Sequence, residues 1–178
     1  TNIGLLHMSV DGITGSVASN KYTVARVNQE FGTRSTIGAL IVDRSGDGTV
    51  TGSSSTDQNQ TYSVDGQWGY NDDLLFSGWV ARTETPGTTD KDGGFSVKMN
   101  YDSGEWAARA NYTEIEENFN PEVGFISRKD YKKEQYYIMR RYRPADLYGL
   151  LEVRPHIMLM NYNDFSGFKE TGFDHYDI

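Results

Sequence analysis

The chain of 178 residues has no cysteine, which excludes a disulfide framework and a thiolate metal site. No stretch approaches the ~20 consecutive apolar residues that a membrane-spanning helix needs. Basic residues are also scarce: 17 Lys and Arg stand against 25 Asp and Glu, for a net charge of −8. This balance argues against a nucleic-acid partner, because neutralising phosphates requires a basic face.

The chain contains regularly spaced strand-like segments with period-two hydrophobicity. Tight connections and long polar connections join these segments alternately. The tight connections are Phe31–Arg34, Tyr70–Asp73, Asp102–Gly104 and Arg143–Asp146. The long ones are Asp11–Lys21, Asp43–Asn59, Glu84–Gly93 and Glu114–Lys132. An up-and-down meander with its long loops at one end is typical of a bacterial outer-membrane β-barrel.

Three segments show the cleanest alternation: Gln60–Tyr70, Phe95–Asp102 and Glu105–Thr113. On the apolar side of each, aromatic residues stand near both ends of the strand. Trp106 and Tyr112 are six positions apart, or about 20 Å of strand, which is close to the ~25 Å apolar band between the aromatic girdles of a membrane barrel. The opposite side carries charges and amides that a packed soluble interior would bury at high cost, namely Asp65, Lys98, Asn100 and Arg109.

The remaining predicted strands are Ile3–Val10, Tyr22–Phe31, Ser35–Asp43, Leu74–Thr83, Lys133–Arg141, Leu147–Asn161 and Phe168–Ile178. Pro155 removes one ladder donor, so a bulge or an edge is expected there. The sequence therefore predicts an all-β fold: residues 1–178 form one antiparallel up-and-down meander of about nine or ten strands, an outer-membrane-type β-barrel or an incomplete piece of one. A soluble sandwich or ligand-binding barrel is the alternative.

The sharpest motif is Phe119-Asn120-Pro121-Glu122-Val123-Gly124-Phe125, followed by Ser127-Arg128 and Tyr131. It resembles a family of large bacterial envelope proteins in which a carbohydrate-binding-like β-sandwich precedes a long C-terminal β-barrel of unknown function. Further pieces similar to that family occur in the same order at 3–6, 24–27, 34–39, 62–66 and 83–87. The resemblance implies an internal piece of the barrel, with the sandwich domain and some strands absent.

The Phe119–Phe125 motif also has a physical interpretation of its own. Pro121 fixes φ and biases Asn120 toward an extended backbone, while Gly124 allows a geometry that other residues avoid. The motif predicts a structured loop folded back against the barrel wall or into its mouth. A packing role is favoured over contact with a substrate.

Several patterns suggest chemistry without establishing it. Asp43–Gly48 begins like a calcium loop, but position twelve is Ser54 and lacks the bidentate acid; Asp90–Gly94 is a weaker case. Glu114, Glu116 and Glu117 suggest a carboxylate pair, although three acids at a strand end are usually a solvated rim. The three histidines, His7, His156 and His175, lack metal-site spacing. We therefore predict no catalytic, cofactor or metal residue in this chain, and no cofactor.

The polar side of the strands mixes charges of both signs, which either pair across neighbouring strands or shape a lumen. The predicted members are Arg26, Lys98, Arg109, Arg140, Arg154, Glu30, Asp65 and Glu152. The expected function is a pore, anchor or docking platform in the outer membrane of a Gram-negative bacterium, with the lipid bilayer, a glycan and other envelope proteins as partners. A membrane-associated hydrolase and a soluble carbohydrate-binding sandwich are the alternatives.

Overall fold

The computed structural model describes residues 1–46, 57–145, 149 and 151–178. It contains ten strands and, in the part described, no helix. The strands are β1 (Asn2–Val10), β2 (Asn20–Phe31), β3 (Ser35–Gly46), β4 (Gln58–Gly69), β5 (Leu74–Glu84), β6 (Gly93–Asp102), β7 (Trp106–Ile115), β8 (Tyr131–Arg140), β9 (His156–Asn163) and β10 (Lys169–Asp177). The predicted all-β class and strand number are confirmed.

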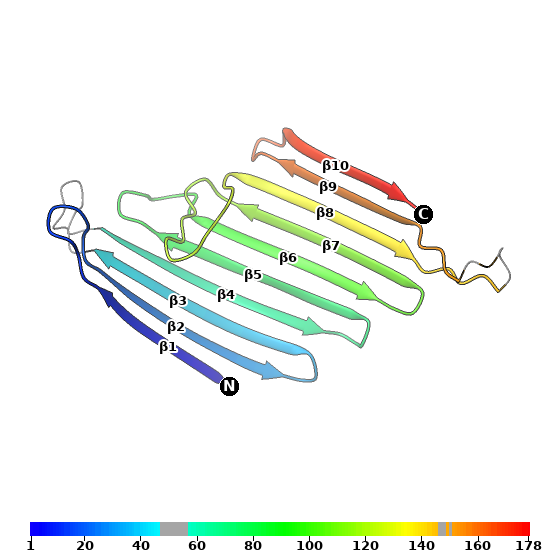
Figure 1. The fold of residues 1–178 in the computed structure, drawn as a ribbon, viewed down its shortest axis with the longest axis horizontal. Helices are drawn as coiled ribbons and strands as arrows, with labels where there is room; N and C mark the ends of the chain where they lie inside the picture. Colours follow the sequence, from blue (N-terminus) through cyan, green and yellow to red (C-terminus); the bar gives the residue numbers. More distant parts are fainter. Residues whose placement is uncertain (47–56, 146–148, 150) are drawn as a thin grey trace.

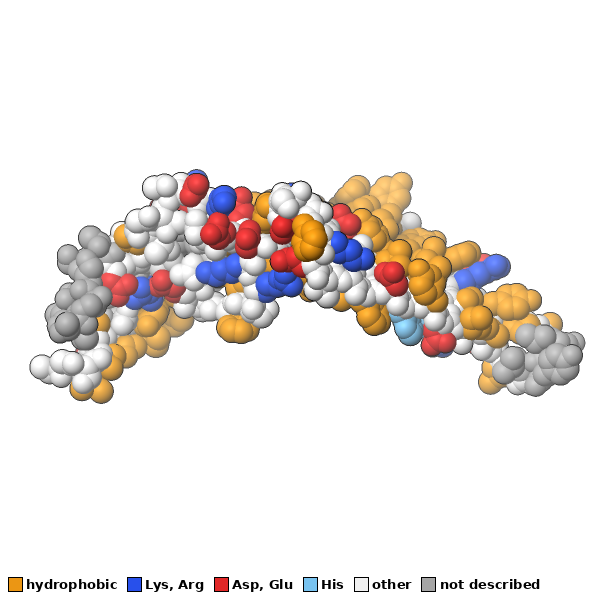
Figure 2. Space-filling view, turned by 90° about the horizontal axis from the view of Figure 1, so that it is seen from above, with side chains coloured by type: hydrophobic (Ala, Val, Ile, Leu, Met, Phe, Trp, Pro, Cys, Tyr) orange, Lys and Arg blue, Asp and Glu red, His pale blue; other side chains and the backbone are white. Residues whose placement is uncertain are grey.

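All ten strands form one antiparallel sheet in chain order, so that each strand pairs with its sequence neighbours (Figure 1). β1 and β10 are the two edges, and the sheet is open: it does not close into a barrel. Figure 2 shows it as an arch whose two ends lie far apart. The described residues contain no helical segment with the length and apolarity needed to traverse a bilayer.

The predicted alternation of tight and long connections holds for the first seven connections and is wrong for the eighth. The connection after β8 runs from 141 to 155, where a tight turn at Arg143–Asp146 was expected, and β9 begins only at His156. Tyr142 and Val153 form an isolated bridge, and Pro155 accepts a bond from Arg140 N through its carbonyl oxygen at 3.1 Å. The ladder is thus interrupted at Pro155, as its missing N–H requires.

The two faces of the sheet differ most clearly over β4–β7. One, here called the apolar face, carries hydrophobic side chains that face each other across the strands, such as Val64 opposite Val80 and Trp68 opposite Phe76. The other, the polar face, carries Thr61, Asp65, Ser96, Lys98 and Arg109 among others. Toward the edges the polar face becomes mixed, with Leu40 and Val42 on β3 and Met158 and Met160 on β9.

The small hydrophobic core lies on the polar face and not between two layers. Ala81, Ile115 and Phe119 are buried together, with Trp79, Ile126 and Tyr131 packed against them. Phe119 and Ile126 belong to the connection between β7 and β8, so this connection covers the sheet. The described residues provide no second sheet to cover either face, and the apolar face stays about half exposed: Val64 is 47% and Val80 is 57% accessible.

Candidate functional site

The connection 116–130 between β7 and β8, which contains the Phe119–Phe125 motif, folds back over the polar face. Phe119 stacks on Trp79 of β5 with ring centroids 6.4 Å apart, and only 3% of Phe119 is exposed. Gly124 N donates to the carbonyl oxygen of Pro121 at 2.9 Å, which closes a turn inside the motif. The structure therefore confirms the expected structured loop folded against the sheet.

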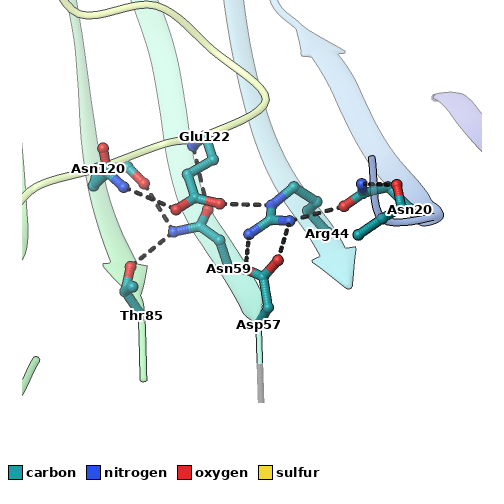
Figure 3. Close-up of polar contacts among 8 residues, drawn as sticks. Asn20, Arg44, Asp57, Asn59, Thr85, Asn120 and Glu122 are labelled. Carbon is teal, nitrogen blue, oxygen red and sulfur yellow. Dashed lines mark hydrogen bonds and ion pairs between the residues drawn. The ribbon is translucent and has the colours of Figure 1, made fainter. Parts of the chain in front are cut away.

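Asn59 of β4 is the centre of the polar contacts that hold this connection, and only 1% of it is exposed (Figure 3). Its Nδ2 donates to the carbonyl oxygen of Asn120 at 2.8 Å and to Thr85 Oγ1 at 2.9 Å. Its Oδ1 accepts from Glu122 N at 3.3 Å. Asn59 thus binds the main chain of the motif at two points, and Thr83 Oγ1 accepts from Asn120 N at 2.9 Å. These bonds account for the burial of the Asn59 amide.

Arg44 of β3 adds an ionic contact to the same connection. Its Nε donates to Glu122 Oε2 at 2.6 Å, and its other nitrogens donate to the Asp57 carboxylate and to Asn20 Oδ1. The contacts of Arg44, Asp57, Asn59, Asn120 and Glu122 are called the clasp below. Hydrogen bonding to the Arg44 guanidinium holds the pKa of Asp57 below its usual value, so the pair stays ionised in moderately acidic solution.

The lowered pKa of Asp57 predicts a pH dependence for the clasp. Asp57 stabilises the folded state above its unfolded pKa of about 3.9, and this contribution is lost as pH falls through the lower folded value. We expect the fluorescence of Trp79, which stacks on Phe119, to change below about pH 3.9 as the connection loosens. The change should be weaker in Asp57→Asn, whereas an identical pH profile in both proteins would contradict the role of this carboxylate.

Two of the predicted charges on the polar face meet across an intervening strand. Arg26 of β2 donates two bonds to Asp65 of β4, both at 2.8 Å, and the pair passes over Gly38 of β3. A Cβ at Gly38 would lie 2.9 Å from an Arg26 nitrogen, so a glycine leaves the room for this bidentate pair. Arg109 lies over the Tyr137 ring at 5.3 Å on the same face.

Three other members of the predicted polar set lie elsewhere. Arg140 faces Trp106 on the apolar face, 5.4 Å from that ring, because the register places both at the same end of β7 and β8. Arg154 and Glu152 lie outside the strands and pair with each other, while Arg143 also binds Glu152 at 2.7 Å. Hydrogen bonding to Arg154 lowers the pKa of Glu152. Residues 151–155 of the predicted strand Leu147–Asn161 precede β9, which begins at His156; this explains both errors for the 152–154 segment, while Leu147, Tyr148 and Leu150 lie outside the described residues.

The three acids near the end of β7 do not face a common cleft. Glu114 accepts from the Tyr112 hydroxyl and pairs with Lys132, and Glu116 Oε2 accepts from Gly93 N at 2.7 Å. Glu117 pairs with Lys91 at 3.2 Å. Each carboxylate therefore has its own structural partner, and the arrangement does not form the facing pair that glycoside hydrolysis requires.

The start of the suspected calcium loop is strand and not loop. Asp43 lies in β3 and accepts from Gln60 Nε2 at 2.8 Å, and Gly46 N donates to the Asp57 carbonyl oxygen at 2.7 Å. The remaining positions of that motif, Asp47, Gly48 and Ser54, lie outside the described residues. In the weaker motif, Asp92 is bound by Arg82 at 2.9 and 3.1 Å, which gives this carboxylate a structural role.

The structure brings two of the three histidines together, which their spacing in the sequence did not predict. His7 lies on β1 and contacts Thr23 Oγ1 at 3.0 Å. His156 and His175, nineteen positions apart in sequence, meet across the β9–β10 hairpin with ring centroids 5.1 Å apart, and Asp177 stands beside them. Sequence spacing alone missed this group. The hairpin register, in which His156 faces Asp177, is the signal that brings it together.

Comparisons of this chain with protein-family models, with curated proteins and with solved structures find no match.

Proposed function

We propose that this chain forms part of the wall of an outer-membrane β-barrel, with the apolar face toward lipid and the polar face toward an aqueous interior. The observation that carries the proposal is the band of half-exposed hydrophobic side chains that crosses the sheet from strand to strand. It includes Val27, Ile37, Ile41, Val64, Trp68, Val80, Val97, Trp106, Ile138 and Ile157. A soluble monomer rarely exposes a continuous apolar surface of this kind.

The end of the apolar band at the tight turns supports the same assignment. Trp68, Tyr70 and Phe76 cluster at the end with the tight turns, with ring centroids 5.7 and 5.9 Å apart. Trp106 lies at the same end of the sheet, with the Arg140 guanidinium over its ring. Aromatic rings and cationic side chains are enriched at the level of the lipid headgroups. The position of Arg140 on the apolar face is therefore suited to a membrane interface.

The polar face suits a wet interior for a complementary reason. Lys98 is exposed, and the Arg26–Asp65 pair keeps about a third or more of each side chain accessible, at 41% and 34%. Ionised groups at mid-bilayer cost several kcal/mol, whereas water inside a barrel solvates them. The clasped connection 116–130 covers part of this face and would narrow the interior.

The open edges set a requirement for this proposal. In lipid, every backbone donor and acceptor needs a partner, so β1 and β10 must pair with each other after further bending or with strands outside these 178 residues. The role we assign is a non-catalytic one, namely a pore, anchor or docking platform. The resemblance of the Phe119–Phe125 motif to a family of envelope proteins with a C-terminal β-barrel supports the barrel assignment and indicates no mechanism. The separately bound carboxylates Glu114, Glu116 and Glu117 give the hydrolase alternative no support, and the single sheet gives none to a soluble sandwich.

Cell fractionation combined with electrophoresis tests the proposal. We expect the protein in the outer-membrane fraction, extracted only by detergent, with a band that migrates differently before and after boiling. Such a shift reports a barrel that resists unfolding by detergent at room temperature. A protein recovered in the soluble fraction, with one unshifted band, would contradict the membrane assignment.

A further inference from the structure

His156, His175 and Asp177 place three metal-binding side chains together on one face of the β9–β10 hairpin. Asp177 is the register partner of His156, and His175 lies two residues before Asp177 on the same face. One donor atom from each side chain lies within 4.8 Å of the other two, and His175 Nε2 is 3.9 Å from Asp177 Oδ2. The hairpin therefore brings two imidazoles and a carboxylate toward one point.

The hydrogen bonding of His156 prepares one of its nitrogens for a metal ion. Its Nδ1 lies 3.1 Å from the carbonyl oxygen of Arg154. A carbonyl oxygen can only accept, so Nδ1 carries the proton and Nε2 presents its lone pair. Metal-bound histidines usually donate their second ring nitrogen to a backbone carbonyl in this way, which fixes the ring and the tautomer.

Neighbouring aromatic rings restrict the orientation of both imidazoles. The Phe173 ring stacks on His175 at 6.0 Å with an interplanar angle of 7°, and the Tyr137 ring lies 5.8 Å from His156. The nearest cation in sequence, Arg154, is paired with Glu152, a carboxylate that it shares with Arg143. The His175 side chain is 40% and the Asp177 side chain 62% exposed, which leaves an entry path for an ion.

We propose that His156, His175 and Asp177 bind a divalent transition-metal ion of the Zn²⁺ class. Two imidazoles and a carboxylate suit Zn²⁺, Ni²⁺ or Cu²⁺ better than Ca²⁺ or Mg²⁺, which prefer oxygen ligands. Three protein ligands leave at least one position of a tetrahedral ion for water or an exogenous ligand. The assignment does not depend on the membrane proposal, because all three ligands belong to a single hairpin.

Binding requires a small closure of the site. Ligands at ~2.0–2.1 Å from a tetrahedral Zn²⁺ lie roughly 3.3 Å apart, less than the 4.8 Å that bounds the donor separations here. The Asp177 side chain, which is 62% exposed at the sheet edge, can make this movement. A bound ion would then cross-link β9 to β10.

Titration of the purified protein with Zn²⁺ against a chromophoric indicator, and with Co²⁺ by visible absorption, tests the site. We expect one ion per chain and a Co²⁺ spectrum with nitrogen and oxygen ligands. His156→Ala, His175→Ala and Asp177→Asn should each weaken Zn²⁺ binding by at least about tenfold. His7→Ala is the matched control, because His7 lies on β1 at the opposite edge of the sheet, and it should bind like the parent.

Each variant is first checked for the same strand content by circular dichroism, so that a loss of binding is not a loss of fold. The proposal is overturned if the parent protein binds no Zn²⁺, if His175→Ala binds as tightly as the parent, or if His7→Ala loses binding to the same extent. The proposal is supported if all three ligand variants keep the strand content of the parent and bind Zn²⁺ about tenfold more weakly, while His7→Ala binds like the parent.

Discussion

Replacement of Val64 by lysine is expected to destabilise the membrane-inserted protein by about 2–4 kcal/mol. Val64 lies near the middle of β4 on the apolar face, between Ala39 and Val80 of the neighbouring strands, and is 47% exposed. If this face contacts lipid, the lysine ammonium must sit near the bilayer midplane or drag water toward it. Equilibrium unfolding in urea from lipid vesicles measures the difference.

Ser63→Lys is the matched control, since Ser63 precedes Val64 on the same strand and points to the polar face near Asp65. At the same depth, this lysine would enter water and should change the unfolding free energy by less than about 1 kcal/mol. The pair of variants separates lipid exposure from general intolerance of β4. Equal effects of the two lysines, or a neutral Val64→Lys, would contradict the assignment of the faces.

Removal of the Asn59 side chain is the second change with a large expected effect. Asn59→Ala leaves the carbonyl oxygen of Asn120 and the amide of Glu122 without the partners that they have at 2.8 and 3.3 Å. Each buried polar group left unpaired costs about 1–3 kcal/mol. We expect the connection 116–130 to detach from the sheet, which limited proteolysis within that segment would record as faster cleavage.

Asn100→Ala provides the comparison for this experiment. Asn100 is a half-buried amide on the polar face of β6, opposite Leu75 and Arg109 and outside the clasp. Its removal should leave the cleavage rate of the 116–130 segment unchanged. If Asn59→Ala is cleaved no faster than Asn100→Ala, the clasp does not hold the connection in place.

The strands were predictable where the two faces of the sheet carry opposite chemistry. In β4, β6 and β7 apolar and polar residues alternate with a period of two, and the predicted segments match the observed ones closely. The start of β9 was not predictable in the same way. Beyond the interruption at Pro155, Tyr142 and Val153 still pair as an isolated bridge, so residues before β9 also have a strand-like pattern. The alternation extends through that interruption, while the hydrogen-bonded ladder does not.

The clasp was only partly predictable from the sequence. The Phe119–Phe125 motif indicated a structured loop, but its partners Arg44 and Asn59 lie 78 and 61–63 positions away in sequence. Only the tertiary docking of the connection brings them together. The histidine group was not predicted, because its members are far apart in sequence. The β9–β10 register, which shifts by one residue between Lys169 and Thr171, places His156 opposite Asp177.

Quenching of tryptophan fluorescence by brominated lipids tests the central claim most directly, because the three tryptophans report both faces. Trp68 and Trp106 lie on the apolar face, and Trp79 lies on the polar face beneath Phe119. In vesicles with acyl chains brominated near the headgroup, variants that retain only Trp68 or only Trp106 should be strongly quenched, and a variant that retains only Trp79 should not. Equal quenching of all three, or strong quenching of Trp79 alone, would contradict a sheet whose apolar face contacts lipid.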